Sequence, residues 1–124
     1  MSMPSRTILV VDDNSDVLEV VSALLEAEGY AVATADNGAD ALEQLRAGLK
    51  PALVILDLTM PVMDGWEFRD RQLKDPELRD IPTIIYSAIG THGSVDGMRV
   101  AGAFEKGDDF DVMLELIADI CRRP

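Results

Sequence analysis

Two kinds of hydrophobic pattern alternate along the chain. Short, nearly continuous apolar runs, rich in β-branched residues, occupy Ile8–Val11, Ala52–Leu56 and Thr83–Tyr86. Such runs are typical of strands buried on both faces, as in a parallel sheet. Weaker strands are expected at Ala31–Ala35 and around Ala103–Phe104. The pattern therefore predicts five strands.

Segments with helical periodicity separate these strands. The expected helices are Ser15–Glu28, Ala39–Ala47, Gly65–Leu73, a short one within Thr91–Gly102, and Asp109–Arg122. The fourth is weakened by its three glycines, because each interior glycine costs a helix about 1 kcal/mol relative to alanine. Asn14 or Ser15 is a plausible cap for the first helix, which Gly29 would end. This strict alternation predicts an α/β protein with a (βα)5 doubly wound parallel sheet and helices on both faces.

The apolar positions also predict which face of each helix is buried. In the first helix the predicted core stripe is Val17, Val20, Val21 and Leu24. Leu18 and Leu25 lie off that stripe and would form an exposed apolar patch for a partner, unless a wider stripe buries both. The other predicted core positions are Ala41, Leu42, Leu45, Phe68, Leu73, Phe110, Met113, Leu114, Ile117 and Ile120, with Val112 and Leu116 outside the last stripe.

The length of 124 residues and the hydrophobic share of 48% fit one domain with a proper core. We expect this domain to span residues 7–122, after a loose tail at Met1–Arg6. Apolar runs such as Ala52–Leu56 are far too short to cross a membrane, and no signal segment opens the chain. The single cysteine, Cys121, excludes an internal disulfide and provides no metal cluster. A cytoplasmic protein is the simplest interpretation.

Charge narrows the choice of partners. Eleven Lys and Arg against 23 Asp and Glu give a net charge of −12. A surface this negative repels nucleic-acid phosphates and anionic membranes, so neither is an expected direct partner. Cations and proteins with basic patches are favoured instead.

Several polar residues stand where the predicted strands end. Asp12–Asp13 follow the first strand, Asp57 the third, Ser87 the fourth and Lys106 the fifth. Taken singly, each has an ordinary explanation: a helix cap, a turn former, a loop serine and a surface lysine. Ligands of open α/β sheets, however, bind outside the carboxyl ends of the strands, where all five residues would meet. This joint placement favours a functional site.

Three neighbouring carboxylates need compensation. Two carboxylates about 5 Å apart repel by roughly 3 kcal/mol at an effective dielectric near 20. Such a cluster persists when a lysine or a cation offsets its charge. Oxygen ligands without His or Cys point to Mg²⁺ rather than zinc. The lone His92 lies in the glycine-rich stretch and is interpreted as a solvent-facing loop residue.

Four motifs resemble the receiver domain of bacterial two-component response regulators, over essentially the full chain. They are Val10–Asn14, Val54–Gly65, Ile84–Ala88 and Phe104–Gly107, of which the second is highly specific. The resemblance implies the flavodoxin-like strand order 2-1-3-4-5. It also implies a phosphorelay signalling domain that assists its own phosphorylation and dephosphorylation but is not a turnover enzyme.

The resemblance further implies residue roles. Asp57 would be the phosphoacceptor, taking a phosphoryl group from a phosphohistidine of a histidine kinase or a histidine phosphotransfer protein. Asp12, Asp13 and Asp57 would hold Mg²⁺, together with the backbone carbonyl of Thr59.

The remaining implied roles concern the attached phosphoryl group and the output. Lys106 would neutralise phosphoryl charge, and Ser87 would hydrogen-bond the attached group. The Ser87/Lys106 face would contact a downstream output protein or domain, and a homodimer would use the face of residues 91–122.

Two positions depart from the family pattern. Gly107 follows the lysine where the family usually has proline, and Ala103 stands where an aromatic residue is common, with Phe104 one position later. Because Ala103 has no ring to swing inward, we expect the signal to appear as a backbone shift over Ala88–Gly97.

Three other functions fit parts of the pattern. A flavodoxin shares the strand order, but Asp12–Asp13 would repel its flavin phosphate. An aspartyl-phosphate phosphohydrolase would need a second Asp where Thr59 stands. A receiver-fold interaction module that phosphorylation does not regulate remains open on sequence alone.

Overall fold

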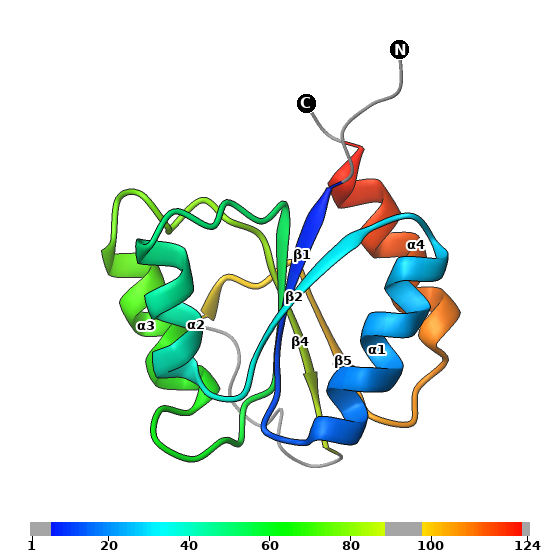
Figure 1. The fold of residues 1–124 in the computed structure, drawn as a ribbon, viewed down its shortest axis with the longest axis horizontal. Helices are drawn as coiled ribbons and strands as arrows, with labels where there is room; N and C mark the ends of the chain where they lie inside the picture. Colours follow the sequence, from blue (N-terminus) through cyan, green and yellow to red (C-terminus); the bar gives the residue numbers. More distant parts are fainter. Residues whose placement is uncertain (1–5, 89–97, 123–124) are drawn as a thin grey trace.

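The computed structural model describes residues 6–88 and 98–122. Its elements, in chain order, are β1 (Thr7–Val11), α1 (Ser15–Ala27), β2 (Ala31–Ala35), α2 (Gly38–Arg46), β3 (Leu53–Leu56), α3 (Gly65–Lys74), β4 (Thr83–Ser87), β5 (Gly102–Glu105) and α4 (Phe110–Cys121) (Figure 1). The expected short helix falls largely on residues 89–97, outside the described residues, as do His92 and nearly all of the expected N-terminal tail. Gly102, the last residue of that expected helix, opens β5 instead.

The five strands form one parallel sheet. Their order is β2-β1-β3-β4-β5, which confirms both the predicted fold class and the flavodoxin-like strand order. In Figure 1, α2 and α3 cover one face of the sheet, and α1 and α4 cover the other. None of the described helices is long and apolar enough to cross a membrane.

The continuous apolar strands supply both layers of the core. Successive strand side chains point to opposite faces, so one strand feeds two clusters. In β1, Leu9 and Val11 pack in the cluster under α2 and α3, and Ile8 and Val10 pack in the cluster under α1 and α4. All four are at most 1% exposed. A sheet with both faces covered therefore explains why the four residues Ile8–Val11 are all apolar.

The predicted core stripe of α1 is wrong at two positions. Val20 is 58% exposed and Leu24 40%, whereas Val21 and Leu25 are buried. Leu18 is half-buried and packs against the core cluster under α1 and α4, which contains Val21 and Leu25. The expected exposed patch of Leu18 and Leu25 is therefore also wrong. The alternative of a wider stripe that buries both leucines holds only in part, because Leu25 is buried and Leu18 half-buried while Val20 and Leu24 are exposed; the buried face is shifted rather than widened. Because apolar residues occupy two overlapping helical faces, periodicity alone could not select between them.

Two further helix faces differ from expectation. In α4, Leu116 was expected outside the core stripe but is half-buried and packs on the core. A Cβ added at Gly102 would lie only 2.7 Å from Leu116 Cδ2, so this leucine sits closely over β5. In α3, Phe68 is buried as predicted, but the polar residues Arg69 and Gln72 are buried beside it at 4% and 0% exposure.

Candidate functional site

The hydrogen-bond ladder of the sheet continues into the site. The backbone N–H of Asp12 donates to the Ala35 carbonyl at 3.1 Å, and the backbone N–H of Asp57 donates to the Val11 carbonyl at 3.0 Å. The Lys106 N–H likewise donates to the Ser87 carbonyl at 2.7 Å. Each residue is therefore fixed by its neighbouring strand one position beyond the end of its own strand. The structure brings the predicted residues to one edge of the sheet.

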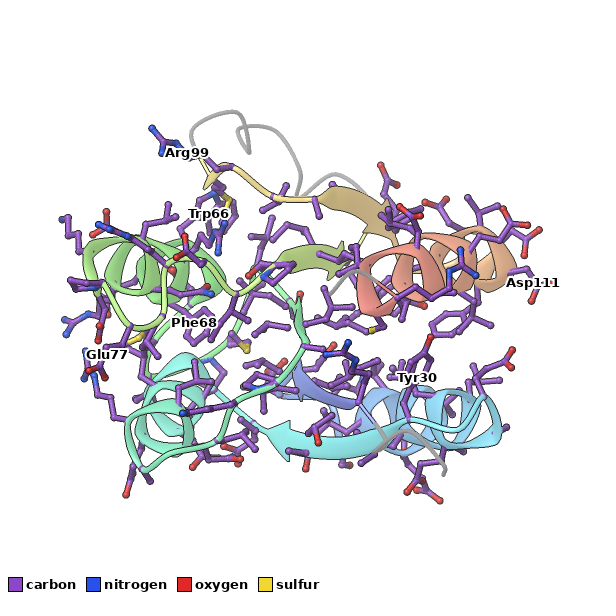
Figure 2. All side chains as sticks on the ribbon, turned by 90° about the horizontal axis from the view of Figure 1, so that it is seen from above. Tyr30, Trp66, Phe68, Glu77, Arg99 and Asp111 are labelled. Carbon is purple, nitrogen blue, oxygen red and sulfur yellow. The ribbon has the colours of Figure 1, made fainter. Side chains whose placement is uncertain are left out.

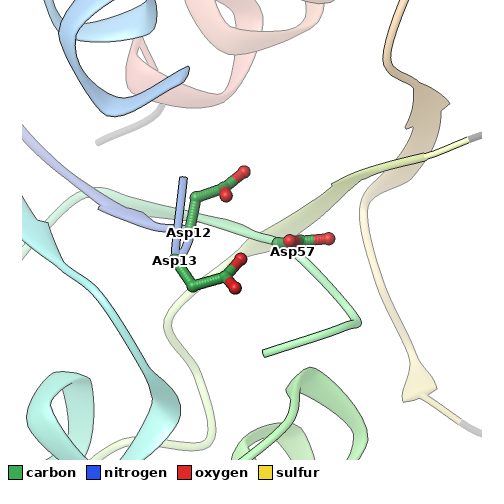
Figure 3. Close-up of side chains that lie close together, drawn as sticks. All are labelled: Asp12, Asp13 and Asp57. Atoms are coloured by element: carbon green, nitrogen blue, oxygen red, sulfur yellow. The ribbon is translucent and has the colours of Figure 1, made fainter. Parts of the chain in front are cut away.

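Three carboxylates converge at this edge. One oxygen each of Asp12, Asp13 and Asp57 lies within 4.8 Å of the others (Figure 3). Asp12 and Asp57 are 2% and 4% exposed, whereas Asp13 is exposed. Burial raises the pKa of Asp12, and the charge of Asp57 adds to this effect against the lowering influence of Lys106 and the Asn14 N–H. The cluster is thus electrostatically costly.

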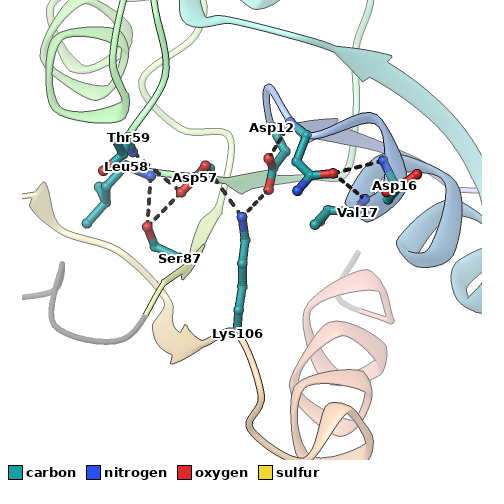
Figure 4. A network of polar contacts seen from close by, with 9 residues as sticks. Asp12, Asp16, Val17, Asp57, Leu58, Thr59, Ser87 and Lys106 are labelled. Carbon is teal, nitrogen blue, oxygen red and sulfur yellow. Dashed lines mark hydrogen bonds and ion pairs between the residues drawn. The ribbon is translucent and has the colours of Figure 1, made fainter.

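Lys106 compensates part of that charge. Its Nζ lies 2.8 Å from Asp12 Oδ2 and 3.5 Å from Asp57 Oδ2 (Figure 4). Burial by itself lowers the pKa of Lys106, but hydrogen bonds and opposite charges from Asp12 and Asp57 outweigh it and raise that pKa. The ammonium is therefore held in its charged form between two buried carboxylates.

Asp57 is also held from the side opposite Lys106. The Ser87 hydroxyl donates to Asp57 Oδ1 at 2.6 Å and accepts from the Leu58 N–H at 3.3 Å. The Thr59 N–H makes a longer contact of 3.4 Å with the same Oδ1 (Figure 4). The two carboxylate oxygens of Asp57 therefore face different groups, hydroxyl and amide on one side and ammonium on the other.

The ordinary explanations for the helix cap, the loop serine and the surface lysine do not hold. Asn14, not either aspartate, is the N-cap of α1: its side chain accepts from Asp16 N and Val17 N. Asp12 supports this cap only indirectly, because its Oδ1 accepts the Asn14 N–H at 2.9 Å. Ser87 is fully buried within a strand, and the Lys106 side chain is only 25% exposed.

Gly65 is a site residue whose role the sequence did not reveal. A Cβ at this position would collide with the Asp57 carbonyl oxygen and would lie 2.8 Å from Leu58 Cα. The Gly65 N–H donates to the Leu58 carbonyl at 3.0 Å, so α3 begins directly against the loop that follows β3. Asp64 caps this helix by accepting the Glu67 N–H at 2.9 Å. Only glycine permits so close an approach to the backbone of Asp57.

The donor set of the cluster fits a hard divalent cation. It consists of three carboxylates, contains neither His nor Cys, and includes two buried members, one of which carries a raised pKa. Mg²⁺ prefers one or two carboxylates with further oxygen ligands. These residues therefore fit Mg²⁺ better than a metal that prefers nitrogen or sulfur ligands.

A family model described as the response regulator receiver domain matches residues 8–106. The chain belongs to this family. The receiver domain is 38% identical over 119 residues to the transcriptional regulatory protein PrrA of Mycobacterium bovis, covering 96% of this chain and 48% of PrrA. It is 31% identical to the polar-differentiation response regulator DivK of Brucella anthropi, covering 78% of each. The receiver domain thus spans about half the length of one of these relatives.

Solved structures show the same fold. The response regulator protein TrrA of Thermotoga maritima, in complex with Mg²⁺ and BeF, aligns with a TM-score of 0.81 and 32% identity over 93% of this chain and 98% of that one. The receiver domain of a histidine kinase from Syntrophus aciditrophicus aligns with a TM-score of 0.83 and 26% identity, covering 97% and 96%. The agreement extends over nearly the whole receiver domain.

The departure at Ala103 and Phe104 can be followed in the packing around β5. Ala103 is exposed, so β5 presents no ring at the position where the family often has one. Phe104 is half-buried in the cluster under α1 and α4, and pairs in register with Tyr86. Tyr86 in turn makes an edge-on contact with Phe110 at 6.0 Å between ring centroids. The rings around β5 therefore belong to the core packing.

Proposed function

We propose that Asp57 accepts a phosphoryl group from a phosphohistidine of a histidine kinase or histidine phosphotransfer protein. The observation that carries this proposal is the environment of Asp57: a buried carboxylate between the Ser87 hydroxyl and the Lys106 ammonium, beside Asp12 and Asp13. Membership of the receiver family supports it, as does similarity to a regulator crystallised with Mg²⁺ and BeF.

The transfer is a displacement at phosphorus. One carboxylate oxygen of Asp57 attacks the phosphorus and forms the aspartyl P–O bond, while the P–N bond to the donor imidazole breaks. The electron pair of that bond goes to the imidazole, which takes up a proton. Lys106, already 3.5 Å from Asp57, stabilises the charge on the phosphoryl oxygens.

Asp12, Asp13 and Asp57 would hold Mg²⁺ together with the Thr59 carbonyl. When bound there, Mg²⁺ supplies positive charge for the phosphoryl oxygens. The carboxylates that bind it gain relief from their mutual repulsion. Thr59 carries a hydroxyl where a phosphohydrolase would need an acid/base carboxylate, so the aspartyl phosphate serves as a signal rather than as a turnover intermediate.

The output begins at Ser87. The attached phosphoryl group carries about −1.5 to −2 charges where the Asp57 carboxylate carried one, and Ser87 and Lys106 must accommodate this larger charge and its additional oxygens. The Ser87 hydroxyl exchanges its 2.6 Å bond to Asp57 for one to the phosphoryl group. Because the Ser87 carbonyl also accepts the Lys106 N–H, movement at β4 reaches β5 directly. An output partner, or a second copy using residues 91–122, would contact this side, where Val112 is 52% exposed.

Acetyl phosphate, a small phosphoryl donor, tests this function. Incubation with Mg²⁺, followed by intact-mass measurement, should show the addition of one phosphoryl group. Asp57→Asn should abolish the addition, and Asp70→Asn, which changes an exposed carboxylate on α3, should leave it intact. Failure of the natural sequence to be labelled, or equal labelling of Asp57→Asn, would favour the interaction module that phosphorylation does not regulate.

A further inference from the structure

A charged pocket lies away from the phosphorylation site. It has a volume of about 610 Å³ and opens between the C-terminal half of α3, the loop leading to β4 and the residue Arg99 before β5. Its lining includes Arg69, which contacts Thr83 at the amino end of β4. Asp57, in contrast, follows the carboxyl end of β3, the parallel strand next to β4. The pocket and the phosphorylation site therefore lie at opposite ends of the strands.

Arg69 brings a buried positive charge to this pocket. Its side chain donates from Nε to the Met98 carbonyl at 2.8 Å, from Nη1 to Gln72 Oε1 at 2.9 Å and to Thr83 Oγ1 at 3.0 Å, and from Nη2 to the Arg99 carbonyl at 2.9 Å. All four acceptors are neutral, and within residues 6–88 and 98–122 no carboxylate forms an ion pair with Arg69. Burial accordingly lowers the pKa of Arg69.

These hydrogen bonds explain how Arg69 ties residues 98–99 to α3, but they do not neutralise its charge. Burying a charge without a counter-charge is costly, even when its hydrogen bonds are satisfied. An anion in the pocket would supply the missing charge.

The rest of the lining strengthens this positive potential. Lys74, Arg79 and Arg99 also line the pocket, against two carboxylates, Asp70 and Asp80. Lys74 pairs with Asp70 at 2.9 Å. Arg79 and Arg99 are exposed (Figure 2 labels Arg99), and neither forms an ion pair in the described part of the chain. The pocket is thus cationic in a protein of net charge −12. A cleft with an excess of positive charge raises the local concentration of anions.

We propose that this pocket binds a small anion with at least two negative charges on phosphate or carboxylate groups. Guanidinium groups match both kinds of oxyanion through paired N–H donors. The volume lies within the range of roughly 300–1,000 Å³ that is typical of small-molecule sites. Because Met98 and Arg99 belong to the segment that leads into β5, the bound anion would stabilise the entry to the strand that precedes Lys106.

Titration with pyrophosphate and with citrate tests the pocket. Amide NMR spectra of the full chain, recorded without Mg²⁺ and at constant ionic strength, should show saturable shifts around residues 69–80 and 98–99. Arg79→Gln/Arg99→Gln should weaken binding at least tenfold. The matched control Arg46→Gln/Lys50→Gln removes two cationic side chains that line a different pocket and should bind like the natural sequence.

The two probes distinguish phosphate from carboxylate as the group that the pocket binds. Tighter binding of pyrophosphate identifies phosphate groups as the ligand chemistry, and tighter binding of citrate identifies carboxylates. Non-saturable shifts, or equal weakening in both double variants, would mean general screening by counter-ions and would overturn the proposal. Labelling of Arg79→Gln/Arg99→Gln by acetyl phosphate should stay normal, so the two proposed sites can fail independently.

Discussion

At the scale of single residues, the three aspartates of the site are not equivalent. Asp12 and Asp57 are buried and share Lys106, whereas Asp13 is exposed and has no hydrogen bond or ion pair among the described residues. Asp13 therefore adds repulsion to the cluster without receiving direct compensation. A cation held by the cluster, as proposed above, would supply that compensation.

Asp13→Asn should accordingly stabilise the metal-free protein. Removing one charge within 4.8 Å of two others relieves repulsion, which solvent screening reduces to about 1 kcal/mol at an exposed position. Urea unfolding in the presence of a chelator measures the change. Asp16→Asn is a suitable control: this exposed acid lies in the first turn of α1, so its loss should slightly destabilise the helix. A less stable Asp13→Asn variant would mean that Asp13 anchors the fold.

At the scale of elements, α1 presents an apolar strip next to the site. Val20 and Leu24 are four residues apart, share one helix face and are 58% and 40% exposed. The helix begins at Ser15, two residues after Asp13. Its exposed face is therefore suited to contact a phosphohistidine donor that reaches Asp57.

Val20→Asp tests this contact. Transfer from a phosphohistidine donor should slow about tenfold, the equivalent of about 1.4 kcal/mol of lost contact energy, while labelling by acetyl phosphate stays unchanged. Val112→Asp provides a matched control, because it alters a similarly exposed valine on α4. Equal slowing with both donors would indicate damage to the fold, and unchanged transfer would show that the donor contacts another face.

At the scale of the whole molecule, the site joins separate parts of the sheet. Asp12, Asp57, Ser87 and Lys106 follow or end four different strands, and their contacts connect β1, β3, β4 and β5. A cation held by the aspartates would therefore stabilise the native state as a unit, since the unfolded chain cannot assemble this cluster.

Millimolar Mg²⁺ should raise the Tm of chelator-treated protein. Binding at a concentration of 100 times Kd contributes about 2.7 kcal/mol, which corresponds to a rise of several degrees for a domain of this size. Differential scanning calorimetry measures the shift, and Asp12→Asn/Asp13→Asn should reduce it strongly. An unchanged Tm in the natural sequence, or an equal rise in the double variant, would contradict the metal assignment.

Local sequence pattern predicted the five strands, the four described helices and the composition of the site. The apolar runs in β1, β3 and β4 are continuous because both faces of a parallel sheet are covered, and that requirement is visible residue by residue. The polar residues that end these runs fall at one edge because parallel strands share a direction. For the same reason, Asp12, Asp57 and Ser87 could be expected to meet before any contact was known.

Tertiary packing decided which side chains are buried where the local pattern allows more than one choice. In α1, two helical faces are apolar, and only the fit against the sheet buries Leu25 and exposes Leu24. In α3, Arg69 is buried because acceptors from β4 and residues 98–99 surround it, and those partners are distant in sequence. The 2.6 Å bond from Ser87 to Asp57 likewise joins residues thirty positions apart. Such contacts depend on three-dimensional placement, because side-chain periodicity describes one element at a time and carries no information about its neighbours.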